Sequence, residues 1–384
     1  MTTVLVINAG SSSIKLRVLD AGDEVTAALD IDQWDGSADS GDLRQFLRGL
    51  SGIGAVGHRV VHGGSQFTRA TVLDESVTAA IASLTDLAPL HQPRALAGIN
   101  ATRAALPGIP AVACFDTAFH AGMPAAAASY ALPGDWTDRF GLRRYGFHGL
   151  SHEYAASRSA QLINTDLERI AVVTCHLGAG SSLAAVQGAR CVDTTMGFTP
   201  LEGLVMATRS GSVDPGLLVW LLRRGGLSLA ELASGLEHSS GLAGLARLPG
   251  GSGDMRDVRL AADAGSAHAR LAIDVHAHRL RREIAAMAAA MNGLDVLAFT
   301  GGIGEHQAAV RAEAAAGLGF LGVAIDPGRN DGATGDADVS APSAGVRTLV
   351  IAAREDVEIA RQVRAVLAAD GRVSEHAPTG DLLP

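Results

Sequence analysis

Two apolar runs rich in β-branched residues flank the polar stretch NAGSSS at residues 8–13. The first run, TVLVIN, is mostly apolar, whereas in the second, IKLRVLD, the apolar Ile14, Leu16 and Val18 alternate with polar neighbours. Such runs are typical of strands that are buried on two faces or on one. The pattern predicts two paired strands with NAGSSS as the turn of a hairpin. The polar, acidic stretch 20–51 that follows is expected to be an excursion or a short helix rather than core.

The same pattern returns at IAVVTCHLGAGSSLAAVQ, residues 170–187. It predicts a strand that ends at Cys175, a loop, and a second strand that begins at Leu183. The tetrapeptide AGSS occurs in both loops, at residues 9–12 and again at 179–182. Glycine and serine are common in loops, so chance is the simpler explanation, but the strands on both sides of both copies favour a duplicated domain.

The rest of the chain alternates helical and strand patterns. Residues 225–290 are rich in Leu and Ala with charged residues at helical spacing, which predicts helices that cover a sheet. The segment DVLAFT then predicts a strand, GGIG at 301–304 a tight turn, and EHQAAVRAEAAAGL a helix. A last helix is expected over REDVEIARQVRAVLAA. This alternation indicates an α/β protein.

Composition narrows the class of protein further. A chain of 384 residues favours two domains, and 47% hydrophobic against 18% charged residues is typical of a globular protein. The net charge of −9 argues against nucleic acid or an anionic membrane as partner, because both attract basic surfaces. No apolar stretch approaches the roughly 20 residues of a membrane span, and the start of the chain lacks a secretory pattern. Three cysteines without metal-like spacing fit small core residues in a reducing compartment, so a cytoplasmic location is expected.

Three loops of small residues are candidate phosphate contacts: NAGSSS, GAGSS and GGIG. Small residues let backbone N–H groups approach an anion, and serine hydroxyls add donors. Each loop alone is weak evidence, and neither the P-loop pattern nor GxGxxG occurs at these sites. Two strand-loop-strand hairpins, one in each half, fit a nucleotide held between duplicated domains.

Candidate catalytic groups lie in other glycine-rich or apolar segments. Arg59 in GHRVVHGG and Arg209 in MATRSG have apolar and glycine neighbours, where an unpaired guanidinium is costly. In phosphoryl transfer, arginines and a histidine such as His148 neutralise the moving charge, and carboxylates hold Mg²⁺. Asp116 and Glu355 are the carboxylates expected in that role. For Asp116 a simple turn or cap residue is an equally good interpretation, and the other histidines, His62, His120 and His152, fit ordinary core or surface positions.

Taken together, the motifs resemble the acetate kinase family. The matching segments, in order and spacing, are NAGSSSIK, GHRVVHGG, PLHQP, FDTAFH, RRYGFHGLSH, HLGAGSS, DTTMGFTPLEGLVMATRSG, DMRD and GGIGE. They run from residue 4 to about residue 365. The resemblance implies reversible, Mg²⁺-dependent transfer of phosphate from ATP to acetate, giving acetyl phosphate and ADP, with Mn²⁺ as an alternative metal.

The resemblance also implies a fold and an assembly. The fold would be two duplicated ribonuclease H-like (actin-like ATPase) domains, each a mixed sheet flanked by helices, with the active site in the cleft between them. Residues 1–119 and 357–384 would form the first domain, and residues 120–356 would form the second. The second domain would carry most nucleotide contacts and the interface of a homodimer.

Site residues follow from the matched motifs. The catalytic residues implied are Arg59, Asp116, His148 and Arg209. The acetate pocket implied is Arg59, Val61, Leu90, Phe147 and Pro200. The metal would be held by Asn8 and Glu355. The nucleotide-binding residues implied are Ser11, Ser13, Lys15, His176, Gly178, Gly180, Asp254, Met255, Arg256, Gly301, Gly302, Ile303 and Gly304.

Four departures from the family pattern and two alternatives remain. This chain has Gln92 and His306 where Asn is usual, and Asp356 where a second Glu is common. Family members typically have Asn where this chain has Ala179, so a side-chain contact to the ATP phosphates is missing. Propionate or butyrate could replace acetate as the acceptor. A different class of protein, a nucleotide-gated binding protein of the chaperone or actin kind, would leave both arginines without a role and would need an additional binding domain.

Overall fold

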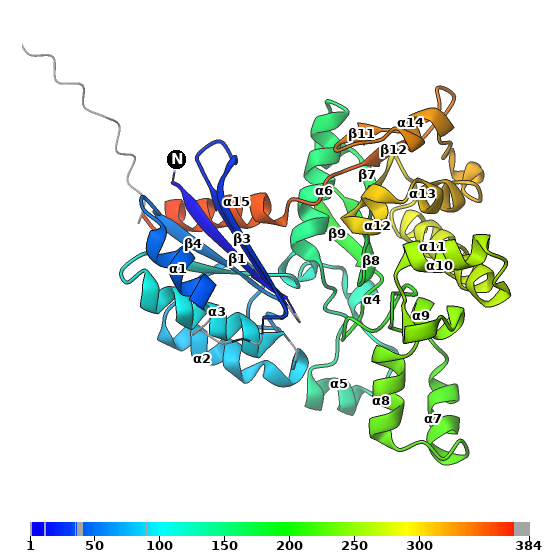
Figure 1. Cartoon of the computed structure of the whole chain (residues 1–384), viewed down its shortest axis with the longest axis horizontal. Helices are drawn as coiled ribbons and strands as arrows, with labels where there is room; N and C mark the ends of the chain where they lie inside the picture. Colours follow the sequence, from blue (N-terminus) through cyan, green and yellow to red (C-terminus); the bar gives the residue numbers. More distant parts are fainter. Residues whose placement is uncertain (1, 11–12, 35, 37–40, 90, 372–384) are drawn as a thin grey trace, which may run out of the picture. The chain divides into compact units, whose positions relative to one another are not determined.

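The computed structural model describes residues 2–10, 13–34, 36, 41–89 and 91–371 (Figure 1). The chain divides into two compact units. One comprises the residues up to Ala118 together with those from Arg354 onward, and the other is Phe119–Ala353. Glu355 therefore belongs to the same unit as Asn8, Arg59 and Asp116.

The first unit is built on a six-stranded mixed sheet with the order β3-β2-β1-β4-β6-β5. Strands β1, β2 and β3 form an antiparallel meander, β1, β4 and β6 run parallel, and β5 is antiparallel to β6. The strands are β1 (Val4–Ala9), β2 (Ser13–Leu19), β3 (Val25–Asp32), β4 (Ala55–Val60), β5 (Thr71–Val72) and β6 (Ala111–Phe115). Asn8 pairs with Lys15 and Ala9 with Ile14, which confirms the predicted hairpin.

The prediction for residues 20–51 was correct for a short helix but wrong in excluding the segment from the core. The segment supplies β3, which pairs along its length with β2, and the helix α1 (Gly41–Gly49), whose Leu43 and Leu47 pack in the core with Trp34. Residues of β3 alternate between exposed and partly buried. An edge strand with one exposed face needs few large apolar residues, so its hydrophobic signal is weak.

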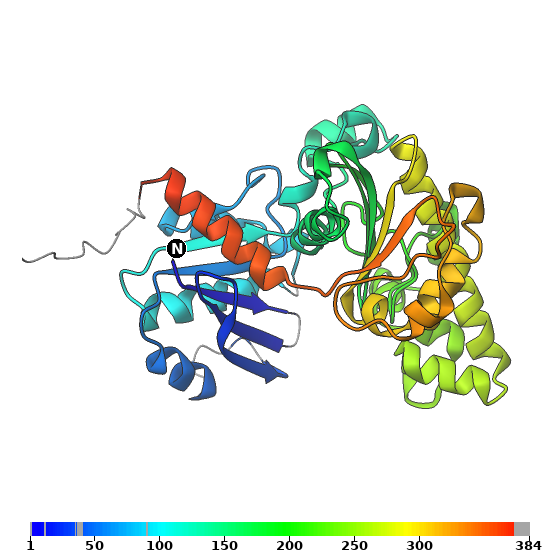
Figure 2. The same cartoon turned by 90° about the horizontal axis from the view of Figure 1, so that it is seen from above.

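Helices cover both faces of the first sheet. Helix α1 packs on α3 (Gln92–Ala105), which covers β1 and β4, and α2 (Glu75–Ser83) packs beside α3. Helix α15 (Glu355–Ala369) contacts β1, β4 and β6 and lies obliquely over the strands in Figure 2. At Gly57 on β4, a Cβ atom would lie 2.5 Å from Cγ2 of Ile359, so only glycine lets α15 come this close. The neighbours of Gly57 face the other way, since His58 bonds Thr102 of α3.

The second unit repeats this sheet. Its order is β11-β12-β10-β7-β8-β9, with an antiparallel meander of β7, β8 and β9, parallel β7, β10 and β12, and an antiparallel β11 at the edge. The strands are β7 (Ala171–Leu177), β8 (Ser181–Gln187), β9 (Arg190–Thr194), β10 (Val296–Thr300), β11 (Ala337–Asp338) and β12 (Arg347–Val350). Each strand has a counterpart in the first sheet with the same neighbours and directions, which confirms the duplicated α/β fold. The two AGSS segments fall at the equivalent hairpins, β1–β2 and β7–β8.

Two long helices sandwich the second sheet. Helix α6 (Gly149–Leu162) packs against Val172 and its face of the sheet, and α11 (Ala267–Ala290) packs against Val173 and the opposite face. The other helices of this unit are α4 (Ala125–Ala128), α5 (Gly134–Phe140), α7 (Pro215–Arg223), α8 (Leu229–His238), α9 (Gly241–Ala246), α10 (Met255–Asp263), α12 (Gly301–His306), α13 (Ala308–Ala315) and α14 (Pro327–Asp331). The helices predicted between residues 225 and 290 are confirmed.

The segment GGIG is not the predicted tight turn. Helix α12 begins at Gly301, directly after β10, and includes all four of its residues. Gly301 has φ +78°, and a Cβ atom there would lie 2.8 Å from the carbonyl oxygen of Leu177. Glycine is therefore required by both the backbone conformation and the close approach to β7.

Two composition-based expectations can be compared with the structure. All three cysteines are buried and none forms a disulfide, as predicted. Within the part of the chain that the structure describes, no helix is both long enough and apolar enough to cross a bilayer.

Candidate functional site

A charged cluster lies at the carboxyl ends of the parallel strands in the first unit. Asn8 is near the end of β1, Arg59 is near the end of β4, and Asp116 directly follows β6. Glu355 is the first residue of α15. Ligands of open α/β sheets bind at this edge, outside the carboxyl ends of the strands.

Arg59 holds the cluster together. Its Nε donates to Oδ1 of Asp116 at 3.0 Å and its Nη2 donates to Oδ2 at 2.6 Å, which is a bidentate pair. Its Nη1 donates to Oδ1 of Asn8 at 3.0 Å, and Nδ2 of Asn8 donates to Oε2 of Glu355 at 3.1 Å. Asp116 lies in a turn, as its alternative interpretation had it, and is also the ion-pair partner of Arg59. Because a guanidinium has five donors, one N–H on each Nη of Arg59 has no partner among the described residues and is available for a ligand.

The electrostatics of this cluster favour a cation. Asp116 is buried, and this burial raises its pKa, while the Arg59 charge acts in the opposite sense. Burial also opposes the charge on Arg59, but Asp116 and Glu355 outweigh it and raise the Arg59 pKa. Two carboxylates, Asp116 and Glu355, therefore surround the single guanidinium of Arg59. When both carboxylates are ionised, the three side chains carry a net charge of −1.

These residues fit a magnesium ion that is shared with a substrate. Among the described residues, no three His, Cys, Asp or Glu side chains gather as a metal site. Mg²⁺, however, is usually bound by one or two carboxylates together with substrate phosphates and water. Glu355 and Asp116, with the Asn8 amide between Arg59 and Glu355, supply oxygen ligands of that kind.

In the second unit, two histidines stack beside the β7–β8 hairpin. His148, with φ +57°, lies at the start of α6, and His176 lies on β7. Their rings are stacked with centroids 4.4 Å apart. Nδ1 of His148 is 2.9 Å from Oγ of Ser182, and Nδ1 of His176 is 2.8 Å from Oγ of Ser151.

Arg209 and His148 meet over Gly180, in the turn of that hairpin. A Cβ atom on Gly180 would lie 3.4 Å from both Cε1 and Nε2 of His148, and 3.6 Å from Nη1 of Arg209. The missing side chain leaves a space bordered by an imidazole edge and a guanidinium. A group with several acceptor oxygens could occupy this space and contact both side chains.

The environment of Arg209, like the space over Gly180, indicates an anion site. It is half-buried, and its side chain makes no hydrogen bond or ion pair with any other described residue. Burial lowers the pKa of Arg209, and Glu237 offsets this only in part. Its loop is fixed on both sides, since Oγ1 of Thr208 donates to the Glu237 carbonyl and the N–H of Ser210 donates to the Leu236 carbonyl. A rigidly held, uncompensated cation of this kind is costly unless a ligand pairs with it.

The predicted acetate-pocket residues are partly placed. Val61 is buried in the first unit, and Leu90 lies outside the described residues. In the second unit Phe147 is buried, and its carbonyl accepts from Nε2 of His120 at 2.9 Å. Pro200 is partly exposed on the loop after β9. The loops of Phe147 and Pro200 are joined where the N–H of Tyr145 and the next N–H donate to the Gly197 carbonyl.

The predicted nucleotide residues are spread over both units. Ser11 is outside the described residues, Ser13 is at the start of β2, and Lys15 is exposed on β2. In the second unit, the N–H of Gly178 donates to the carbonyl of Gly180 in the hairpin turn, next to His176.

Residues 254–256 and α12 differ in accessibility. Asp254 caps α10 and pairs with the exposed Arg256 at 2.6 Å. Met255 is buried in the core, so its side chain is not accessible to a ligand. Gly302 is exposed, Ile303 packs partly on the core, and Gly301 and Gly304 are buried.

Sequence reasoning missed three groups around these sites. Ser182 and Thr174 both bond His152, which is buried in the core as one of its predicted interpretations had it. Arg311 is buried and donates to the carbonyls of Gly304 and Glu305 at the end of α12. A hydroxyl in a strand and an arginine in an alanine-rich helix carry no local signal, because their partners come from other elements.

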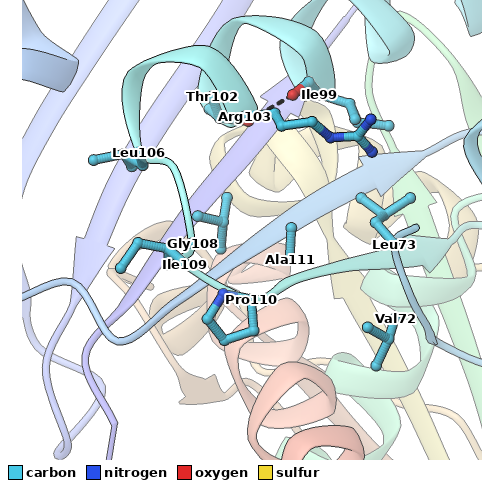
Figure 3. Close-up of a pocket in the computed structure, with 11 residues that line it drawn as sticks. Val72, Leu73, Ile99, Thr102, Arg103, Leu106, Gly108, Ile109, Pro110 and Ala111 are labelled. Atoms are coloured by element: carbon cyan, nitrogen blue, oxygen red, sulfur yellow. Dashed lines mark hydrogen bonds between the residues drawn. The ribbon is translucent and has the colours of Figure 1, made fainter. Parts of the chain in front are cut away.

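Two pockets lie apart from the predicted site residues. One, of about 420 Å³, lies in the first unit between the end of α3 and the sheet, and Figure 3 shows its lining of apolar side chains with Thr102 and Arg103. The other, of about 390 Å³, lies in the second unit and is lined by residues that include Ser210, Ser212 and Arg279. No residue predicted to bind or react lines either pocket.

Comparison with known proteins places the chain among phosphotransferases. The model of the Acetokinase family matches residues 39–361. An acetate kinase from Synechococcus sp. is 55% identical over 308 residues, which cover 80% of this chain and 75% of that protein.

Two solved structures match nearly the whole chain. The crystal structure of Porphyromonas gingivalis acetate kinase has a TM-score of 0.87 and 34% identity, covering 96% of this chain and 100% of the other. A propionate kinase from Francisella tularensis has a TM-score of 0.86 and 34% identity, covering 95% and 100%. The matched segment spans most of the sequence, and the chain belongs to the Acetokinase family.

Proposed function

We propose that the protein catalyses reversible, Mg²⁺-dependent transfer of the γ-phosphoryl group of ATP to acetate, giving acetyl phosphate and ADP. The observation that carries this proposal is the guanidinium of Arg209, which has no hydrogen bond or ion pair with a described residue. Its Nη1 lies 3.6 Å from where a Cβ atom of Gly180 would be, beside the ring of His148. Family membership and the similarity to acetate kinases support the choice of reaction.

The proposed reaction needs no strong base. Acetate is ionised at neutral pH, so its carboxylate oxygen attacks the γ-phosphorus directly as the bond to the β-γ bridging oxygen breaks and ADP leaves with that electron pair. The main task of the protein is to bring two anions together and hold them in line. Arg209 and His148 contact the transferring phosphoryl group and neutralise the charge on its oxygens.

Residues of the first unit bind acetate, the phosphoryl acceptor, and the metal ion. The free N–H groups of Arg59 bind the acetate carboxylate, and Asp116 fixes the orientation of Arg59 through their bidentate pair. Asn8 and Glu355 hold Mg²⁺, or Mn²⁺, which neutralises the β and γ phosphates when it is bound. The remaining nucleotide contacts are those predicted from the matched motifs, except the buried side chain of Met255.

Propionate is the second candidate acceptor. The identity to the propionate kinase structure, 34%, equals that to the acetate kinase structure, so overall similarity does not separate the two acids. The acetate-pocket residues Val61 and Phe147, predicted from the family resemblance, suit a methyl group better than a longer chain. One methylene changes discrimination by only about 1–3 kcal/mol, so activity with propionate is expected at a lower kcat/KM.

Trapping of the acyl phosphate with hydroxylamine tests the reaction. The purified protein is incubated with ATP, Mg²⁺ and acetate, propionate or butyrate, and the hydroxamate is measured. The expected result is hydroxamate with acetate, less with propionate and little with butyrate. ATP hydrolysis without hydroxamate would refute the proposal and favour a nucleotide-gated binding protein.

A homodimer formed through the second unit belongs to the same proposal, as does a location in the cytoplasm, where ATP is available. Helix α7 has no buried residue, and its Leu217, Val219 and Trp220 are each about half exposed. Helix α7 packs against α8, but a cluster of exposed apolar side chains marks an interaction surface, so a covering partner is expected. Analytical ultracentrifugation should show a dimer that Trp220→Glu converts to a monomer. A monomeric wild-type protein at micromolar concentration would contradict this assembly.

A further inference from the structure

The hydroxyl of Tyr130 joins the two ends of a turn that carries Pro200. The N–H of Phe198 donates to Oη of Tyr130 at 2.8 Å, and the same hydroxyl donates to Oε2 of Glu202 at 2.7 Å. The donor in each bond is fixed by the chemistry, because a backbone N–H only donates and a carboxylate accepts. Residues 198–202 form the Pro200 turn, which a side chain from the segment between α4 and α5 thus closes.

The middle of the Pro200 turn depends on this closure. Among the described residues, residues 198–201 make no hydrogen bond to a residue outside 197–202 except the one to Tyr130. The two bonds inside the turn both end on Thr199 and are longer, at 3.3 Å each. Loss of the Tyr130 hydroxyl would therefore leave Pro200 held only by these two weaker bonds.

The other end of the bridge, at Glu202, is firmly anchored. Nη2 of Arg144 donates to Oε1 of Glu202 at 2.7 Å, and Nη1 of Arg144 donates to the carbonyls of Thr195 and Met196 at 3.1 and 3.0 Å. The Arg144 guanidinium also lies over the Tyr130 ring, 5.5 Å from its centroid. Burial and Glu202 raise the pKa of the Tyr130 hydroxyl above its usual value, so this group stays protonated and donates.

Tyr130 also packs where the Pro200 turn meets the segment of Phe147. A Cβ atom on Gly197 would overlap the Tyr130 hydroxyl and the Glu202 carboxylate, so glycine is required there. The carbonyl of Gly197 accepts from the N–H of Tyr145 and from the next N–H, directly before Phe147. The two residues of the second unit that are predicted to line the acetate pocket, Phe147 and Pro200, are thus joined beside Tyr130.

We propose that Tyr130 is a positioning residue for acceptor specificity, because its hydroxyl closes the Pro200 turn and holds Pro200 against a longer acid. The choice of acid rests on the proposed function, since Pro200 is assigned to the acetate pocket by the matched motif, whereas the closure of the turn does not. An apolar pocket can reject one additional methylene only if its wall does not move aside. With the hydroxyl removed, Pro200 can shift, so that propionate fits better and acetate is held less closely.

Hydrogen–deuterium exchange measured by mass spectrometry tests the closure in the full-length protein without substrates. In Tyr130→Phe, peptides covering residues 198–202 should exchange several-fold faster than in the wild type, because the Phe198 N–H loses its acceptor. The matched control is Tyr145→Phe, which keeps a ring packed on Phe198, with centroids 5.8 Å apart, and removes a hydroxyl that donates to the Gly141 carbonyl instead. Exchange in this control should match the wild type. Unchanged exchange in Tyr130→Phe would overturn the proposal, whether or not the protein is a kinase.

The hydroxylamine assay tests the specificity. It gives kcat/KM for acetate and for propionate in the wild type, Tyr130→Phe and Tyr145→Phe. The ratio of acetate to propionate should fall about 5-fold in Tyr130→Phe alone, a part of the about 10–200-fold that one methylene is worth in a fitted pocket, with KM for ATP unchanged. A merely structural hydroxyl would lower Tm and leave this ratio as it is in the wild type.

The possible failures are distinguishable. Faster exchange with an unchanged acid ratio in Tyr130→Phe would overturn the specificity role. Wild-type protein that forms no acyl phosphate would reject the proposed function and the choice of acid with it, while the exchange result would still decide the closure of the turn.

Glu202→Met provides a second variant at the anchored end of the bridge. Methionine keeps the length of the side chain but removes the oxygens that accept from Tyr130 and Arg144. Exchange of residues 198–202 should again be faster, and the acid ratio should fall in the same direction as in Tyr130→Phe. If Tyr130→Phe fails to fold, this variant decides: folded Glu202→Met with wild-type exchange and a wild-type acid ratio would reject the proposal.

Discussion

Replacing Arg209 by leucine should make the protein more stable and nearly inactive at the same time. The guanidinium is half-buried without a hydrogen bond or ion pair among the described residues, so the folded protein bears the desolvation of a cation that only a ligand relieves. Leucine removes that penalty and keeps an apolar side chain in the same loop. Function and stability therefore conflict at this position.

The two effects have different sizes. A buried polar group without a partner costs about 1–3 kcal/mol, and for a half-buried group the lower value, about 1 kcal/mol, applies. For a unit of this size 1 kcal/mol corresponds to a rise in Tm of roughly 2–4 °C. Loss of a guanidinium that contacts a transferring phosphoryl group should lower kcat by about 1,000-fold.

Arg311→Leu is the matched control for stability. Arg311 is also buried and forms no ion pair with a described carboxylate, but it donates to Oδ1 of Asn330 at 2.7 Å and to the carbonyls of Gly304 and Glu305 at 2.8 Å. Its loss leaves these acceptors unsatisfied and should lower the free energy of unfolding by about 3–5 kcal/mol. The two leucine variants should therefore shift Tm in opposite directions.

Differential scanning calorimetry and the hydroxylamine assay measure both effects on the same samples. A Tm below that of the wild type for Arg209→Leu would show that the guanidinium has a partner in the folded protein. A kcat within 10-fold of the wild type would remove Arg209 from the chemistry. Either result would refute the reasoning from its uncompensated charge.

Three further predictions follow from the same structure. Gly180 has no left-handed backbone, so Gly180→Ala should fold. Its methyl group would occupy the space beside His148 and should lower kcat by about 100-fold. Near-normal turnover would show that the phosphoryl group does not use this space. Ala179→Asn restores the amide typical of the family and should lower KM for ATP several-fold at unchanged KM for acetate. Burial lowers the pKa of His120 and His276 to about 4, so on acidification the unfolded chain binds their protons before the folded protein does. The free energy of unfolding should therefore fall by about 1 kcal/mol per pH unit for each histidine as pH drops from about 6.5 to 4. Urea unfolding at several pH values measures this, and a flat profile would show that these rings are charged in the folded protein.

The duplicated sheets could be predicted because each hairpin carries its own local pattern. The apolar runs around AGSS have strand periodicity in both halves, and the turn residues between them are small and polar. Strand β3 was missed because it lies at the edge of its sheet, and its position depends on pairing with β2 rather than on its own apolar residues. Helix α12 was read as a turn because two adjacent glycines are typical of turns, whereas here close packing against β7 requires Gly301.

The candidate site was predictable as a set of residues but not as a set of contacts. Motifs identified Arg59, Asp116 and Arg209, yet the sequence does not distinguish a paired arginine from an uncompensated one. The difference depends on residues far away in the chain: Arg59 meets Asp116 because β4 and β6 are neighbouring parallel strands. The hydrogen bond between Ser182 and His148 likewise depends on two elements, because Ser182 lies on β8 and His148 lies at the start of α6. No local sequence pattern shows that these two positions meet.

The placement of α15 has a consequence for biosynthesis. This helix, the last one described, covers the strands β1, β4 and β6, which are among the first parts of the chain to be made. Ribosomes add about 5–20 residues per second, so one face of the early sheet stays open for roughly 10–50 s while Phe119–Ala353 is synthesised. Nascent chains should therefore bind chaperones through that face, and a prematurely terminated chain that lacks α15 should be degraded rather than accumulate as a half-built enzyme.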